Sequence, residues 1–187
     1  MKPDRLNAFT DGVLAVVITI MVLELKFPAE ANFQAVEAVL PLLGAYLLSF
    51  VNIGIFWTNH HHMMQSAKRV SGAVLWANLA LLFWLSLIPL LIRWIDEAGI
   101  TPWPVACYGL VLMLSAISYM LLERALIAVE GEDSAIRRAV GSKFKEWISF
   151  ALYTGGVLTA FASPLMSVAM YVAVAVTWLV PDRRFEQ

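Results

Sequence analysis

Asp11 is a carboxylate inside an apolar stretch, where an ionised group is costly unless it has a partner or a function. The preceding basic residue, Arg5, lies six positions earlier, which on a straight helix is about 120° away around the axis. We therefore expect the partner of Asp11 on another helix. Two roles stay open at this point: a polar network that locks helices together, or a carboxylate that titrates or binds an ion.

Three consecutive histidines, His60, His61 and His62, have side chains that could hold a metal or a haem. Ligands on one helix converge at spacings of three or four residues, whereas adjacent residues point about 100° apart. Cys107 is the only cysteine, and no HExxH motif completes a ligand set. The pattern favours an interfacial hydrogen-bond network over a metal site.

Asn78 lies in a later apolar stretch, two residues after Trp76. A side-chain amide in lipid must find a hydrogen-bond partner, because leaving it unpaired costs several kcal/mol. We expect Asn78 to bond across helices.

An apolar stripe follows Asp11. Val16, Thr19, Ile20 and Leu23 fall, together with Gly12, on one face of a helix that turns about 100° per residue. On a helix lining a symmetric pore, such a face would form a constriction that excludes water, with the Thr19 hydroxyl as its side-chain oxygen. Ordinary helix packing produces the same periodicity, so the pattern alone does not choose between the two.

These residues are carried by a strongly apolar chain of 187 residues, 60% hydrophobic and 14% charged. A helix needs about 20 apolar residues to cross a hydrocarbon core of roughly 30 Å. We expect an all-α membrane protein with six spans, at residues 6–25, 36–57, 72–92, 103–122, 147–162 and 165–180. Ser163-Pro164 should break the last apolar run into two short halves, so a re-entrant pair is also possible there.

The basic residues fall almost entirely in alternate gaps. Of the 13 Lys and Arg residues, all except Lys26 and Arg93 lie in the N-terminus, the second gap, the fourth gap or the C-terminus. The positive-inside rule then places both termini in the cytoplasm. Residues 1–187 are expected to form a single transmembrane domain.

Motifs of soluble enzymes are missing: there is no phosphate-binding glycine loop and no nucleophile elbow with partners. We expect a protein that is not an enzyme, with no cofactor, no bound metal and no nucleic-acid partner.

Three motifs resemble the transmembrane protein 175 family of potassium channels, in its prokaryotic branch. The first, Arg5-x-x-x-Phe9-Thr10-Asp11, is similar to the family's RxxxFSD signature, with threonine in place of the usual serine. The others are Phe56-Trp57-x-x-His60-His61 and Leu75-Trp76-x-Asn78-Leu79, with Pro89 later.

The resemblance implies six helices per subunit, cytoplasmic termini, and four identical subunits around a central pore lined by the first helix. It implies a potassium-preferring channel in a prokaryotic plasma membrane, with itself and lipids as partners. Potassium would pass near Val16 and Thr19. By position, Val16 matches the constricting residue, Thr19 the threonine tied to potassium preference, and Leu23 an outer apolar ring, with Ile20 on the same face. The network that sets the first helix would comprise Arg5, Phe9, Thr10, Asp11, His60, His61, Trp76 and Asn78.

Two other functions fit the residues. A proton-coupled secondary transporter could titrate Asp11 and relay protons through His60 or His61. A non-conducting membrane scaffold would assemble and pass no ions.

Overall fold

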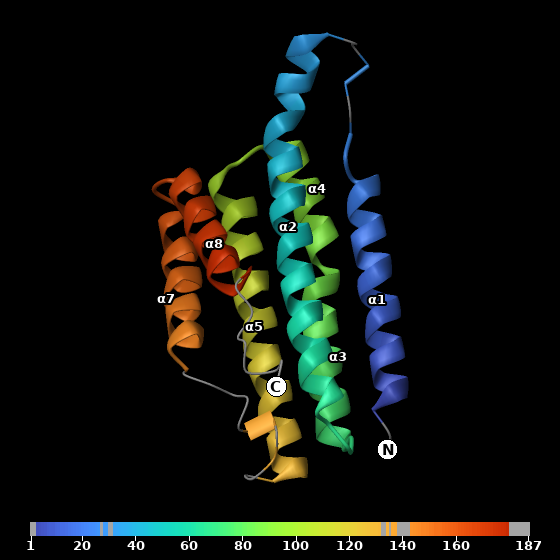
Figure 1. The fold of residues 1–187 in the computed structure, drawn as a ribbon. Coiled ribbons are helices and arrows are strands. Elements are labelled where there is room, and N and C mark those ends of the chain that lie inside the picture. Colours follow the sequence, from blue (N-terminus) through green and yellow to red (C-terminus); the bar gives the residue numbers. More distant parts are fainter. Residues whose placement is uncertain are drawn as a thin grey trace.

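The computed structural model describes residues 3–26, 28–29, 32–131, 134, 136–137 and 143–179, and its ordered elements are helices (Figure 1). The helices are α1 Asp4–Leu23, α2 Phe33–Gln65, α3 Gly72–Ser86, α4 Ile88–Ala98, α5 Pro102–Glu130, α7 Phe144–Thr159 and α8 Pro164–Leu179.

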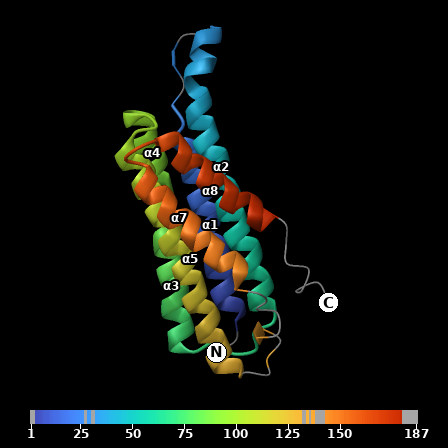
Figure 2. The same ribbon diagram turned by 90° about the vertical axis from the view of Figure 1, so that its left-hand side faces the viewer.

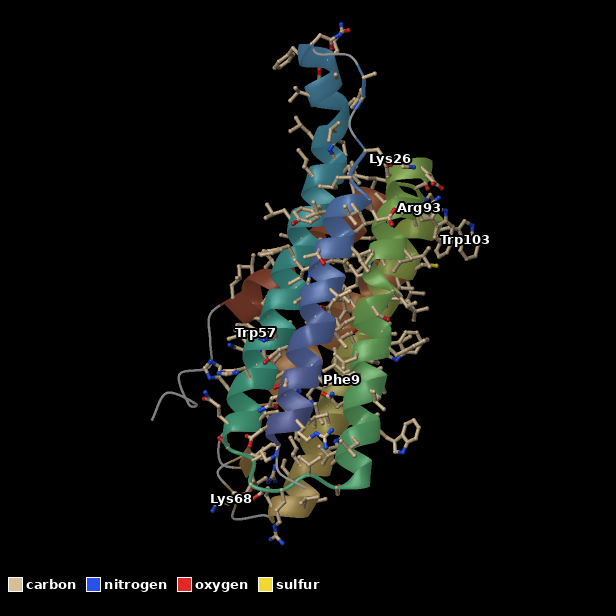
Figure 3. All side chains as sticks on the ribbon, turned by 90° about the vertical axis from the view of Figure 1, so that its right-hand side faces the viewer. Phe9, Lys26, Trp57, Lys68, Arg93 and Trp103 are labelled. Carbon is tan, nitrogen blue, oxygen red and sulfur yellow. The ribbon has the colours of Figure 1, made fainter. Side chains whose placement is uncertain are left out.

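Successive helical segments run in alternate directions along the bundle (Figure 1). The start of α1, the α2–α3 connection and the end of α5 lie at one end, while Lys26 and Arg93 lie toward the other (Figures 1 and 3). The two ends of the bundle thus match the alternation of basic gaps in the sequence. Residues 180–187, including Arg183 and Arg184, lie outside the described part of the chain.

By length and composition, four helical segments can cross a membrane: α1, α2, α3 with α4, and α5. Each of the first four predicted spans overlaps one of these segments, and the chain is a multi-pass membrane protein. The third span is interrupted at Leu87, where α3 ends and α4 begins. The second is longer than predicted, with 33 residues: it begins three residues early, where the Asn32 side chain accepts a hydrogen bond from the Ala35 amide, and ends eight residues late, at Gln65.

The last two helices form a short hairpin that slants across the bundle (Figure 2). The predicted break is confirmed, since the chain turns after Thr159 and α8 begins at Pro164. The α7 helix has 16 residues, about 24 Å along its axis, and α8 is described over the 16 residues from Pro164 to Leu179. The last two predicted spans, 147–162 and 165–180, correspond to α7 and α8, so the six predicted helical segments are all present in the fold.

The centre of the bundle is α5, which packs against α3, α4, α7 and α8. By contrast, α1 contacts α2, α3 and α4 and stands at one edge (Figure 1). Its buried face repeats every three or four residues: Leu6, Thr10, Leu14, Val17 and Met21. The opposite face of α1 is left open, and it carries the stripe noted in the sequence.

Two glycines make room for α8. The fully buried Tyr171 ring lies directly over Gly109 of α5 and Gly156 of α7, so that a Cβ atom at either position would overlap it. Its hydroxyl donates to the Val105 carbonyl over 3.3 Å. The docking of the C-terminal hairpin on α5 depends on this close approach.

Gly156→Ala should destabilise the protein by roughly 1–3 kcal/mol, because the new methyl group has no space beside Tyr171. The matched control is Gly155→Ala, where the added carbon would lie 3.6 Å from the Met170 sulfur, an ordinary contact. Both substitutions replace glycine by alanine inside α7, so the higher helix propensity of alanine stabilises both variants equally. Thermal unfolding in detergent compares them, and equal melting temperatures would contradict the packing described.

Candidate functional site

A buried chain of hydrogen bonds joins the first three helical segments. The Asn78 amide nitrogen on α3 donates to the Thr10 hydroxyl on α1 over 2.9 Å. The Asn78 amide oxygen accepts from Nε2 of His60 on α2, also over 2.9 Å. Because an amide oxygen can only accept, Nε2 of His60 carries the proton. Asn78 thus bonds across helices as expected, and the three buried side chains fix α1 against α2 and α3.

Asp11 has its partner on α2, the neighbouring helix. The Trp57 indole Nε1 donates to the Asp11 carboxylate over 2.8 Å. The Trp57 ring stacks on His61 with 5.6 Å between centroids, and His61 Nε2 bonds the Gln65 amide over 2.9 Å. This second chain lies on the protomer surface, with Trp57 and Phe9 visible on adjacent helices (Figure 3). The sequence places Trp57 in one of the three motifs, but nothing in its spacing identifies it as the Asp11 partner.

Arg5, Phe9 and Trp76, expected in the same network, lie outside both chains and are exposed. Helix rotation explains the separation. Trp76 and Asn78 are two residues apart, so they point about 160° away from each other, and Trp76 is 76% exposed. Arg5 likewise lies about 140° around α1 from Thr10. The network therefore forms from fewer signature residues than expected.

The open face of α1 carries the predicted stripe. Val16 is 54% exposed and Leu23 is 79% exposed, with Gly12, Thr19 and Ile20 exposed beside them. Several of these residues line an open apolar hollow of about 530 Å³ between α1 and the α3–α4 junction: Phe9, Gly12, Val16 and Ile20, with Ser86 and Pro89 opposite. In the protomer this face is uncovered.

Thr19 presents an oxygen on that face. Its hydroxyl donates to the Val16 backbone carbonyl over 2.9 Å. With its proton committed to the helix, the oxygen keeps its lone pairs available for a cation.

Among the described residues, no three His, Cys, Asp or Glu side chains come together as metal ligands. His60 and His61 point to different partners, Asn78 and Gln65, in line with the 100° separation of adjacent helical residues.

The fold and this site define a multi-pass helical membrane protein whose first helix is fixed by polar bonds on one side and open on the other. Residues 5–89 match the family model described as "Endosomal/lysosomal potassium channel TMEM175". A potassium channel of Chryseobacterium sp. (strain P1-3) is 49% identical over 187 residues, covering 100% of this chain and 97% of the relative. The chain belongs to the TMEM175 family, which consists of ion channels and not enzymes.

Two further comparisons agree. A potassium channel of Streptomyces collinus is 32% identical over 126 residues, covering 63% of this chain and 61% of the relative. The crystal structure of a lysosomal potassium-selective channel TMEM175 homolog from Chamaesiphon minutus superposes with a TM-score of 0.75, at 24% identity, over 96% of this chain and 97% of that one. The shared fold thus extends well past residue 89, where the family model ends.

Asn78→Ala should cost about 1–3 kcal/mol of stability for the two partners it leaves unpaired, Thr10 and His60, beyond the loss of its own packing. Asn59→Ala is the control, since the Asn59 amide donates to the Ile55 carbonyl of its own helix. Thermal unfolding in detergent measures the difference. A melting temperature for Asn78→Ala as high as that of Asn59→Ala would show that the buried chain does not hold α1.

Proposed function

We propose that this protein is a potassium-preferring cation channel: a homotetramer with a central pore lined by the open face of α1. The observation that carries the proposal is the exposed stripe from Val16 to Leu23 on a helix whose opposite face is firmly packed. The names of the relatives, potassium channels of Chryseobacterium and Streptomyces, support the choice of ion.

Several copies are needed because one face of one helix cannot surround an ion. Cyclic symmetry would repeat the face around an axis, and each copy would supply the same ring residues. Rotation of α1 decides which residues these are. A turn of about 100°, one residue, would bring Val17 inward in place of Val16. The bonds of Thr10 to Asn78 and of Trp57 to Asp11 oppose such a turn.

Conduction would be passive, through narrow and largely dry rings of Val16, Ile20 and Leu23. Potassium loses its hydration water at lower cost than sodium, so a dry passage favours it, and four Thr19 oxygens would replace part of the lost water. Potassium would pause near Val16 and Thr19. A path without charged ligands should select moderately.

The assembled channel would lie in the prokaryotic plasma membrane with both termini in the cytoplasm, as one domain over residues 1–187. It needs no cofactor, and its partners are its own copies and the surrounding lipid. Purified protein in liposomes tests the proposal directly: a potassium gradient alone, with no proton gradient, should drive flux. A proton-coupled carrier would need the second gradient, and a scaffold would pass nothing.

Val16→Ala and Leu23→Ala should each raise potassium flux, by roughly twofold or more, because smaller rings are wider and easier to wet. Leu158→Ala is the control, since the exposed fraction of Leu158, 70%, lies between those of Val16 and Leu23, but Leu158 is on α7. Flux into liposomes containing equal amounts of tetramer gives the comparison. If the two α1 variants conduct like Leu158→Ala, α1 does not line the path.

Thr19→Val should lower the potassium-to-sodium permeability ratio, by roughly twofold or more, because it keeps the shape of the side chain and removes the oxygen. Thr19→Ser keeps the oxygen and should stay close to the native ratio. Reversal potentials under ion substitution measure both. A native ratio in Thr19→Val would exclude this hydroxyl from selectivity.

A further inference from the structure

The helix α2 extends well beyond α1. Its 33 residues measure about 50 Å, far more than a hydrocarbon core. The Trp57–Asp11 bond sets the register between these antiparallel helices. The α1 helix continues for twelve residues after Asp11 and ends at Leu23. Twelve residues before Trp57 on the antiparallel α2 is Ala45, which therefore lies level with the end of α1. Residues 33–44, here called the α2 extension, therefore lie past the end of α1.

Charged side chains mark where the polar region begins. Glu97 lies 3.0 Å from Arg93 and 3.7 Å from Lys26, and these exposed groups belong at the membrane surface or in water. Figure 3 shows the α2 extension rising beyond Lys26, Arg93 and Trp103. The extension therefore stands outside the hydrocarbon core, where lipid tails cannot cover it.

The α2 extension nevertheless carries an apolar stripe. Phe33 is 81% exposed, Val36 57% and Leu40 56%, and the stripe continues through Leu43 and Leu47. The separations alternate between three and four residues, the 3.5-residue period by which parallel helices pack together in coiled coils. A stripe with this period in an aqueous setting needs another helix to cover it.

We infer that the α2 extensions of neighbouring subunits pack against one another through this stripe and form a collar above the pore. The inference rests on the proposed tetramer. Figure 3 shows the extension rising past the upper end of α1 on the adjacent helix, so symmetry around a pore lined by α1 would place the extensions around its mouth. The occupant that fits is a second copy of the same segment, because equivalent residues face each other when parallel helices pack by heptads.

Cysteine cross-linking tests the collar. Cys107→Ala provides a cysteine-free background, into which either Val36→Cys or Ala38→Cys is introduced. Both positions are exposed, but they point about 160° apart on the helix. With copper–phenanthroline, Val36→Cys should form a covalent dimer in most of the protein, because stripe residues of two copies would come within disulfide range, and Ala38→Cys should not.

The same preparations are tested for tetramer by mass and for potassium flux. A tetramer that conducts, but in which position 36 does not cross-link or cross-links no better than position 38, would overturn the collar while leaving the channel intact. Native protein is run in parallel. If neither the native nor the cysteine-free protein forms a tetramer or passes potassium, the proposed function is wrong, and the collar is excluded with it.

Discussion

Within a membrane, polar side chains must satisfy one another, and this constraint fixes the first helix. Thr10, Asn78 and His60 satisfy one another's hydrogen bonds inside the bundle, and the Trp57 indole donates a hydrogen bond to Asp11 at its edge. Together the two chains hold α1 at one rotation. The direction in which Val16 and Thr19 point depends on that rotation, because a turn of α1 by one residue would expose a different face of the helix.

The remainder of the fold packs behind α3 and α4, on the side away from α1. The α5, α7 and α8 helices pack around Tyr171 and its two glycines, where the close approach leaves no room for a larger residue. That unit gives α3 and α4 a firm backing, and these in turn hold α1. The family-model match ends at residue 89, within α4, so it covers the helices that carry the polar chains and the open stripe.

Hydropathy predicted the first four spans, and Pro164 predicted the break before α8. Helix geometry predicted that the hydrogen-bond partner of Asp11 lies on another helix. The choice of Trp57 was not predictable, because tryptophans near span ends serve equally as interfacial anchors and only the tertiary register brings this one to Asp11. Trp76 shows the reverse: its motif suggested a place in the network, but its position two residues from Asn78 turns it outward. The full length of α2 was missed because span prediction counts only the residues that lipid requires. The Asn32 cap adds three residues at the start, and the helix continues for eight residues past the predicted end, through the polar run to Gln65.

The central claim is that the open face of α1 surrounds an axis shared by identical subunits. Electron cryomicroscopy of the protein in lipid nanodiscs tests it most directly. The account predicts four copies with Val16, Thr19 and Leu23 pointing toward the symmetry axis and a continuous passage between them. A map in which this face packs on a neighbouring subunit away from the axis, or is turned to lipid, would contradict it.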